Sequence, residues 1–225
     1  MGINTVEKID NLVPVKTVLI SVSDKSGLET FIPQLTKINP EVRILSTGGT
    51  FNTIREILGD RAATLLAQVS DYTGQPETQG GLVKTLDFKI YLGILTETYN
   101  PSHQADLKRT DASAIDMVIV NLYPFKETIA KPDAFVEMAR GNIDIGGPCM
   151  IRASAKNYLR VASVVDPSDY PAILRDLESN NGMTTLETRF RLAQKAFGHT
   201  ADYDRAIADY LGRQPMADVS SCYGF

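Results

Sequence analysis

Apolar and polar segments alternate along the chain in the repeating order strand, turn, helix, which is the pattern of an α/β protein. Short runs rich in β-branched residues predict strands at 17–20, 42–45, 65–69, 90–95, 117–122 and 161–165. Apolar residues at helical spacing predict helices at 28–35, 51–58, 134–140, 148–156, 168–177 and 184–211, and the polar segment 103–109 is either a short helix or a loop. The most apolar run, MVIVNL at 117–122, predicts the central strand. This alternation predicts a mostly parallel sheet with helices on both faces.

The two ends of the chain lack the alternation. Residues 1–15 predict a loosely held lead-in that ends at Pro14, and residues 212–225 predict a C-terminal tail that we expect to be mobile. Thr184 and Glu187 have the spacing of a capping box, which places the start of the last helix there. We therefore expect one domain over residues 16–211.

Composition argues against several classes of protein. The formal net charge of −4 is unlike that of a nucleic-acid-binding protein, which usually carries a basic excess. Two cysteines predict no disulfide framework, and with only two histidines the usual zinc-ligand spacings are absent. No apolar run is long enough to span a bilayer, and the N-terminus has no signal-peptide pattern. We expect a soluble cytoplasmic protein that binds neither nucleic acid nor membranes.

Polar clusters follow the first two predicted strands. Ser21, Ser23 and Lys25 come after the first, and the segment Ser46–Thr50, STGGT, comes after the second. Ligands of open α/β sheets bind at such strand ends, and hydroxyls, an ammonium group and backbone N–H groups near glycines suit a phosphate. The simpler interpretation is that Ser23 or Asp24 caps the next helix and that STGGT is a tight turn. Taken alone, the first stretch favours the helix cap, and STGGT leaves both interpretations open.

Four other positions could carry chemistry, and each also has a simpler explanation. Lys84 follows a glycine pair, and Lys156 lies within a predicted helix, so either could be a solvated surface charge. Asp144 is flanked by apolar residues and precedes two glycines, a setting in which a carboxylate faces a turn donor or a ligand. Tyr123 ends the most apolar strand and could simply pack there. We expect no catalytic role for His103 or His199.

Seven motifs, SVSDKSG, STGGT, VSDYTG, GLVKTL, VNLYPF, NIDIGGP and RASAKN, occur in an order and spacing that resemble the IMP cyclohydrolase domain, the N-terminal half of the bifunctional enzyme that completes purine biosynthesis. The resemblance runs from about residue 16 to residue 211. It implies a Rossmann-like fold similar to methylglyoxal synthase. Since no second half follows in the sequence, the resemblance implies a free-standing cyclohydrolase.

The resemblance also implies a reaction and its partners. The carboxamide nitrogen of 5-formamidoimidazole-4-carboxamide ribonucleotide (FAICAR) attacks the formyl carbon, and water leaves to give inosine monophosphate (IMP). The family needs no cofactor or metal. A homodimer is implied, and a separate AICAR formyltransferase is a candidate partner.

The resemblance assigns roles residue by residue. The implied catalytic residues are Lys84, Tyr123, Asp144 and Lys156. The implied 5′-phosphate site consists of Lys25, Thr47, Gly48, Gly49, Thr50 and Thr85. Ser21 and Ser23 are expected nearer the base, and Ser46, Asn121, Ile145 and Gly146 complete the substrate-binding set.

Two departures from the family pattern GRVKTLHPK bear on the charge near the ligand. Leu82 stands where the family has an arginine, and Asp87 stands where it has a histidine. Losing a cation beside an anionic substrate should weaken binding. Two alternatives therefore stay open: a non-catalytic nucleotide-binding regulatory domain of the same fold, and a methylglyoxal-synthase-like enzyme that shares the phosphate site.

Overall fold

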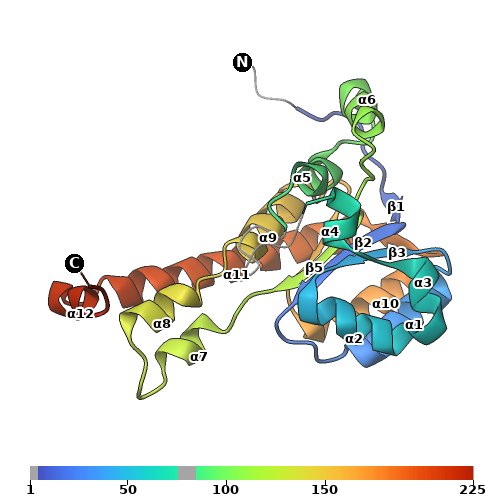
Figure 1. The fold of residues 1–225 in the computed structure, drawn as a ribbon. Coiled ribbons are helices and arrows are strands. Elements are labelled where there is room, and N and C mark those ends of the chain that lie inside the picture. Colours follow the sequence, from blue (N-terminus) through green and yellow to red (C-terminus); the bar gives the residue numbers. More distant parts are fainter. Residues whose placement is uncertain (1–4, 76–84, 225) are drawn as a thin grey trace.

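A computed structural model describes residues 5–75 and 85–224, and its centre is a five-stranded parallel sheet with the strand order β4-β3-β2-β5-β6 (Figure 1). These strands span Leu66–Gln68 (β4), Arg43–Ser46 (β3), Thr17–Val22 (β2), Met117–Asn121 (β5) and Ala162–Val164 (β6). Leu12–Pro14 (β1) and Met183–Thr185 (β7) form a separate antiparallel pair. The expected α/β class and the parallel sheet are confirmed.

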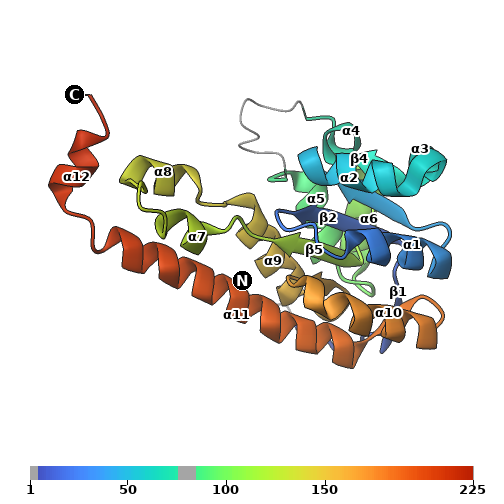
Figure 2. The same cartoon turned by 90° about the horizontal axis from the view of Figure 1, so that it is seen from below.

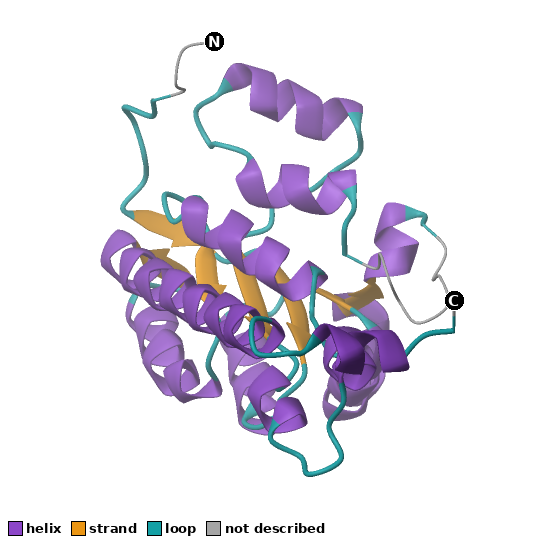
Figure 3. Ribbon diagram, turned by 90° about the vertical axis from the view of Figure 1, so that its left-hand side faces the viewer, coloured by secondary structure: helices purple, strands orange, loops and turns teal. Residues whose placement is uncertain are grey.

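Helices cover both faces of the sheet (Figures 2 and 3). The helices are Leu28–Ile38 (α1), Gly48–Leu58 (α2), Ala62–Leu65 (α3), Val69–Thr73 (α4), Phe88–Leu95 (α5), Pro101–Arg109 (α6), Phe125–Ile129 (α7), Val136–Gly141 (α8), Gly146–Lys156 (α9), Tyr170–Ser179 (α10), Leu186–Leu211 (α11) and Met216–Ser221 (α12), with 3₁₀ turns at Gly59–Arg61 and Pro167–Asp169. The outer half of α11 projects beyond the sheet, and α7, α8 and α12 gather around it (Figure 2).

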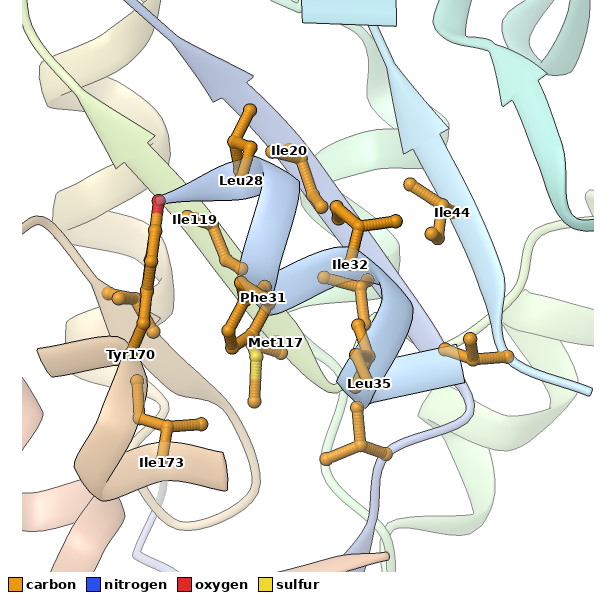
Figure 4. Packing of buried hydrophobic residues seen from close by; sticks show 14 of the residues in the cluster. Ile20, Leu28, Phe31, Ile32, Leu35, Ile44, Met117, Ile119, Tyr170 and Ile173 are labelled. Atoms are coloured by element: carbon orange, nitrogen blue, oxygen red, sulfur yellow. The ribbon is translucent and has the colours of Figure 1, made fainter. Parts of the chain in front are cut away.

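Two apolar clusters, one on each face, hold these layers together. Helix α1 packs Phe31, Ile32 and Leu35 against the sheet, where they meet Ile20 of β2 and residues of α10 (Figure 4). On the other face, α5, α9 and α11 supply the second cluster. Because both faces are covered, β2 and β5 are buried along nearly their whole length, which explains their continuous apolar runs.

The predicted strand at 90–95 is wrong, because this segment forms helix α5. A short apolar run does not distinguish a buried strand from a buried helix by its periodicity. The deciding signal is Asp87, whose carboxylate accepts a hydrogen bond from the Lys89 backbone N–H at 2.7 Å and caps the helix. Gly93 lets α5 pass close to the chain, since a Cβ there would lie 2.4 Å from the carbonyl oxygen of Ser113.

Smaller corrections concern the last helix and the tail. Thr185, and not Thr184, caps α11 by accepting a hydrogen bond from the Thr188 N–H. Residues 216–221 form α12, and the Tyr223 hydroxyl donates a hydrogen bond to Glu137 beside α8. In the described part of the chain no helix is long and apolar enough to cross a membrane.

Candidate functional site

A cavity of about 380 Å³ opens at the carboxyl ends of β2 and β5, where the sheet order places two neighbouring parallel strands. Its lining includes most of the residues that the sequence assigned to the site. These are Ser21, Ser23, Lys25, Thr47, Gly49, Thr50, Thr85, Asn121, Tyr123, Asp144, Ile145 and Gly146. The cavity lies where ligands of open α/β sheets usually bind.

One end of the cavity is built to receive an anion. Thr47 is the N-cap of α2, but its hydroxyl pairs with Ser21 Oγ at 2.9 Å and caps no backbone N–H group of the helix. The ammonium group of Lys25 lies over Gly49, since a Cβ there would be 4.0 Å from Lys25 Nζ. A helix N-terminus with free N–H groups and an adjacent cation favours a phosphate.

Two hydroxyls expected to bind substrate instead tie α2 and β3 to β2. Ser46 is fully buried and donates to the Ile20 carbonyl at 2.7 Å. Thr50 Oγ1 accepts from the Val22 N–H at 3.1 Å and donates to the Val22 carbonyl at 3.0 Å. The Thr50 side chain lines the cavity, but its hydroxyl is occupied by the backbone. Both residues therefore position the anion site through the backbone.

The loop that carries Lys25 is held by Asn121 at the end of β5. Asn121 Oδ1 accepts from the N–H groups of Ser23 at 2.7 Å and Asp24 at 2.9 Å, and its Nδ2 donates to the Asp24 carbonyl at 2.8 Å. Neither Ser23 nor Asp24 caps α1, because the N-cap is Gly27 with φ 78°. Asp24 accepts from the Ser26 N–H instead, which lowers the pKa of its carboxyl group.

The other end of the cavity carries groups that can move protons. Asp144 is partly buried, and this desolvation raises the pKa of its carboxyl group even though N–H groups of Gly147 and Tyr123 act to lower it. Asp144 Oδ1 accepts from the Gly147 N–H at 2.9 Å. The side chain of Tyr123 is 54% exposed at the cavity lip. A carboxyl group with a raised pKa and a phenol that line one cavity are suited to general acid–base chemistry.

Glycines let the second helix N-terminus, that of α9, approach this end closely. A Cβ on Gly146 would lie 2.6 Å from Thr85 Oγ1, and one on Gly147 would lie 2.5 Å from Asp144 Oδ2. The lining also includes Leu86, Val120, Gly141, Ile143 and Met150, which the sequence analysis did not select. Their apolar or small side chains carry no signal that distinguishes cavity walls from core.

The structure does not bring every expected residue to the cavity. Lys156 is exposed at the C-terminal end of α9, whereas Asp144 precedes the N-terminal end of that helix. Eleven residues of helix separate the two ends by roughly 15 Å. Lys84 lies outside the described residues. In segments 5–75 and 85–224 no group of three or more His, Cys, Asp and Glu side chains could hold a metal ion.

The two departures from the family pattern have different outcomes. Asp87 is 6% exposed and caps α5, so its carboxylate serves the helix. Leu82 lies outside the described residues. Asp87 is not among the cavity-lining residues, so its position gives no reason to expect contact between its carboxylate and an anionic substrate.

Two protein-family models match successive segments of the chain. The family model for MGS-like domains matches residues 27–149, more than half of the chain. The chain belongs to the MGS-like domain family. The model for the AICARFT/IMPCHase bienzyme matches residues 154–223, which contain α10, α11 and α12.

Individual relatives agree with both matches. The bifunctional purine biosynthesis protein PurH of Neisseria meningitidis serogroup A is 49% identical over 197 residues, which is 88% of this chain and 36% of that protein. PurH of Chlorobium phaeobacteroides strain BS1 is 45% identical over 207 residues, 92% of this chain and 38% of that protein. The chain thus spans a little over a third of the length of these relatives. The crystal structure of ForH superposes with a TM-score of 0.71 and 32% identity, over 85% of this chain and 96% of ForH.

Proposed function

We propose that the chain is an IMP cyclohydrolase, which closes the second purine ring by converting FAICAR to IMP. The observation that carries the proposal is the cavity with an anion-binding end at Lys25 and the α2 N-terminus and a proton-transferring end at Asp144 and Tyr123. A ribonucleotide has a 5′-phosphate at one end and its reacting groups at the other. The bifunctional PurH relatives support the same assignment.

Ring closure needs three events, and the site residues can serve each of them. A bond forms between the carboxamide nitrogen and the formyl carbon while the nitrogen loses a proton. The former formyl oxygen gains a proton and becomes a hydroxyl group. The hydroxyl then takes up a second proton and leaves as water, while the former formamide nitrogen loses its proton and forms a double bond to the same carbon. We assign these transfers to Asp144 and Tyr123, since the raised pKa of Asp144 makes its carboxylate a stronger base than a solvated aspartate.

Of the two lysines that the sequence assigned to catalysis, we give a catalytic role to Lys84 and none to Lys156. Lys84 precedes Thr85, which lines the cavity, and we assign it the stabilisation of charge on the former formyl oxygen. Loss of one such donor typically costs on the order of 10²–10³ in rate. Lys156 lies at the far end of α9, so we assign it no contact with the reacting atoms in the described arrangement.

The sequence-based expectations of a cytoplasmic homodimer and of a separate AICAR formyltransferase belong to the same proposal. Light scattering after size-exclusion chromatography measures the mass of the assembly. In a coupled assay, a separate formyltransferase would provide FAICAR as substrate, but ring closure itself would not need it.

The direct test follows the absorbance change of IMP formation when purified protein is mixed with FAICAR. We expect cyclisation above the uncatalysed rate, reduced 10²- to 10³-fold in Lys84→Ala. Nucleotide binding without IMP formation would support the regulatory-domain alternative. Release of methylglyoxal from dihydroxyacetone phosphate would support the other alternative. Cyclisation by Lys84→Ala at the wild-type rate would remove Lys84 from the mechanism.

A further inference from the structure

Tyr203, on the outer half of α11, contacts the loop that carries Asp144. The Asp144 backbone N–H donates to the Tyr203 hydroxyl oxygen at 2.8 Å, and that hydroxyl donates to the Asn142 carbonyl at 3.4 Å. Tyr203 is 8% exposed, so water is largely excluded from these bonds. The hydroxyl therefore joins two points of the loop that precedes α9.

The ring of Tyr203 also contacts the segment after Tyr123. It packs edge-on against Phe125, with ring centroids 6.1 Å apart, and Phe125 is 1% exposed. The Phe125 N–H in turn donates to the Tyr123 carbonyl at 2.8 Å. One side chain of α11 thus touches the backbone of one proposed proton-transfer residue and the immediate neighbourhood of the other.

We propose that Tyr203 is a positioning residue for ring closure, which holds Asp144 at the orientation that proton transfer requires. The inference rests on the proposed function. Tyr203 lies outside the segment matched as MGS-like and inside the segment matched to the AICARFT/IMPCHase bienzyme. Helix α11 thereby contacts a loop of the MGS-like segment that lines the cavity.

The loop has two anchors with separate tasks. The Gly147 N–H fixes the Asp144 carboxylate, and the Tyr203 hydroxyl fixes the Asp144 main chain. Without the hydroxyl, a half-buried N–H loses its acceptor, and the loop relaxes to recover one. A displacement of about 1 Å at a reacting group can cost on the order of 10² in rate. The anion-binding end does not touch Tyr203, so substrate affinity should change little.

The experiment compares Tyr203→Phe with Tyr210→Phe. Tyr210 is on the same helix and packs on the same Phe125 with ring centroids 5.9 Å apart, which makes it a matched control. We expect kcat for FAICAR to fall roughly 10- to 100-fold in Tyr203→Phe with KM within about twofold, and to stay near wild type in Tyr210→Phe. Hydrogen–deuterium exchange should show faster exchange of a peptide covering residues 142–146 in Tyr203→Phe alone.

The two measurements separate this inference from the proposed function. If wild-type protein does not cyclise FAICAR, the proposed function fails, and the exchange measurement still tests whether Tyr203 holds the loop. If wild-type protein cyclises and Tyr203→Phe keeps the wild-type kcat, the positioning role is refuted. A fall in kcat without faster exchange at 142–146 also contradicts it, because the loss would not come from the loop.

Discussion

Gly147→Ala is the smallest change that moves the proposed catalytic carboxylate. A Cβ at this position would lie 2.5 Å from Asp144 Oδ2 and 2.6 Å from Leu122 Cδ2. Gly147 is absent from the glycines with positive φ, so alanine is compatible with the backbone there. The added methyl group therefore acts through contact with Asp144 and Leu122 and not through backbone strain.

The size of the effect follows from these distances. Cβ contacts are essentially never shorter than 3.0 Å, and ordinary ones begin at 3.4 Å. The carboxylate oxygen must therefore retreat by about 0.5–0.9 Å, or the N-terminus of α9 must move. Overpacking of this kind typically costs about 1–3 kcal/mol of stability. Misplacement of a reacting group by about 1 Å costs up to about 10² in rate. We expect kcat for FAICAR to fall about 10- to 100-fold, with KM changed less because the α2 anion site is untouched.

The assay is steady-state cyclisation of FAICAR with thermal unfolding of the same samples. Gly198→Ala is the matched control, since Gly198 lies within α11 with nothing within 4 Å of its added Cβ. In a helix interior this change should stabilise the protein by about 0.5–1 kcal/mol and leave the rate unaltered. A Gly147→Ala protein that is folded and cyclises at the wild-type rate would refute the placement of Asp144 in the mechanism.

Three other perturbations test separate parts of the molecule. Lys25→Met should raise KM for FAICAR about 10- to 100-fold, because it removes a charge-assisted contact worth about 1.5–3 kcal/mol. Lys37→Met, on the exposed side of α1, should leave KM unchanged. Because burial raises the pKa of Asp144 above its ordinary 3.8, the native state holds this proton more tightly than the unfolded chain, and stability falls as pH rises from 3.8 through the raised value. Asp144→Asn should therefore abolish cyclisation yet raise the Tm at neutral pH, and a lower Tm would contradict this sign. The sequence places residues 1–15 outside the domain, but buried Arg189 donates to the carbonyls of Asp10 and Asn11. Deletion of residues 1–15 should therefore lower the free energy of unfolding in urea by about 2–5 kcal/mol. An unchanged unfolding midpoint would support the predicted boundary.

The anion-binding end of the site is predictable from local sequence. A buried strand, a polar turn with glycines and a helix N-terminus follow one another within a few residues, so the pattern alone places N–H groups, hydroxyls and Lys25 at one edge of the sheet. What the pattern cannot distinguish is the task of each hydroxyl. Ser46 and Thr50 look equivalent to Thr47 in STGGT. Only the pairing of β3 with β2 and the packing of α2 against β2 show that their hydroxyls bond to strand backbone.

The proton-transferring end depends on contacts between distant segments, which no local pattern records. Asp144 and Tyr203 are 59 positions apart, and nothing near Tyr203 in the sequence marks it as different from other aromatic residues of α11. The misassigned segment 90–95 has a different origin, because a buried apolar run fits a strand or a helix equally well and the local cap at Asp87 distinguishes the two.

The two ends of the cavity should also differ in how they tolerate substitution. Much of the anion site consists of backbone N–H groups, whose position follows from the β3–α2 connection, so a change of one side chain leaves those donors in place. An arginine-to-leucine change at position 82 can thus weaken phosphate binding without dismantling the site. The acid–base end depends instead on the side chain of Asp144, whose carboxylate accepts from the Gly147 N–H and whose main-chain N–H donates to the Tyr203 hydroxyl. Substitutions at the acid–base end should therefore alter kcat, whereas substitutions at the anion-binding end should alter KM. This division of effects links the two ends of the cavity to the two parts of the proposed chemistry.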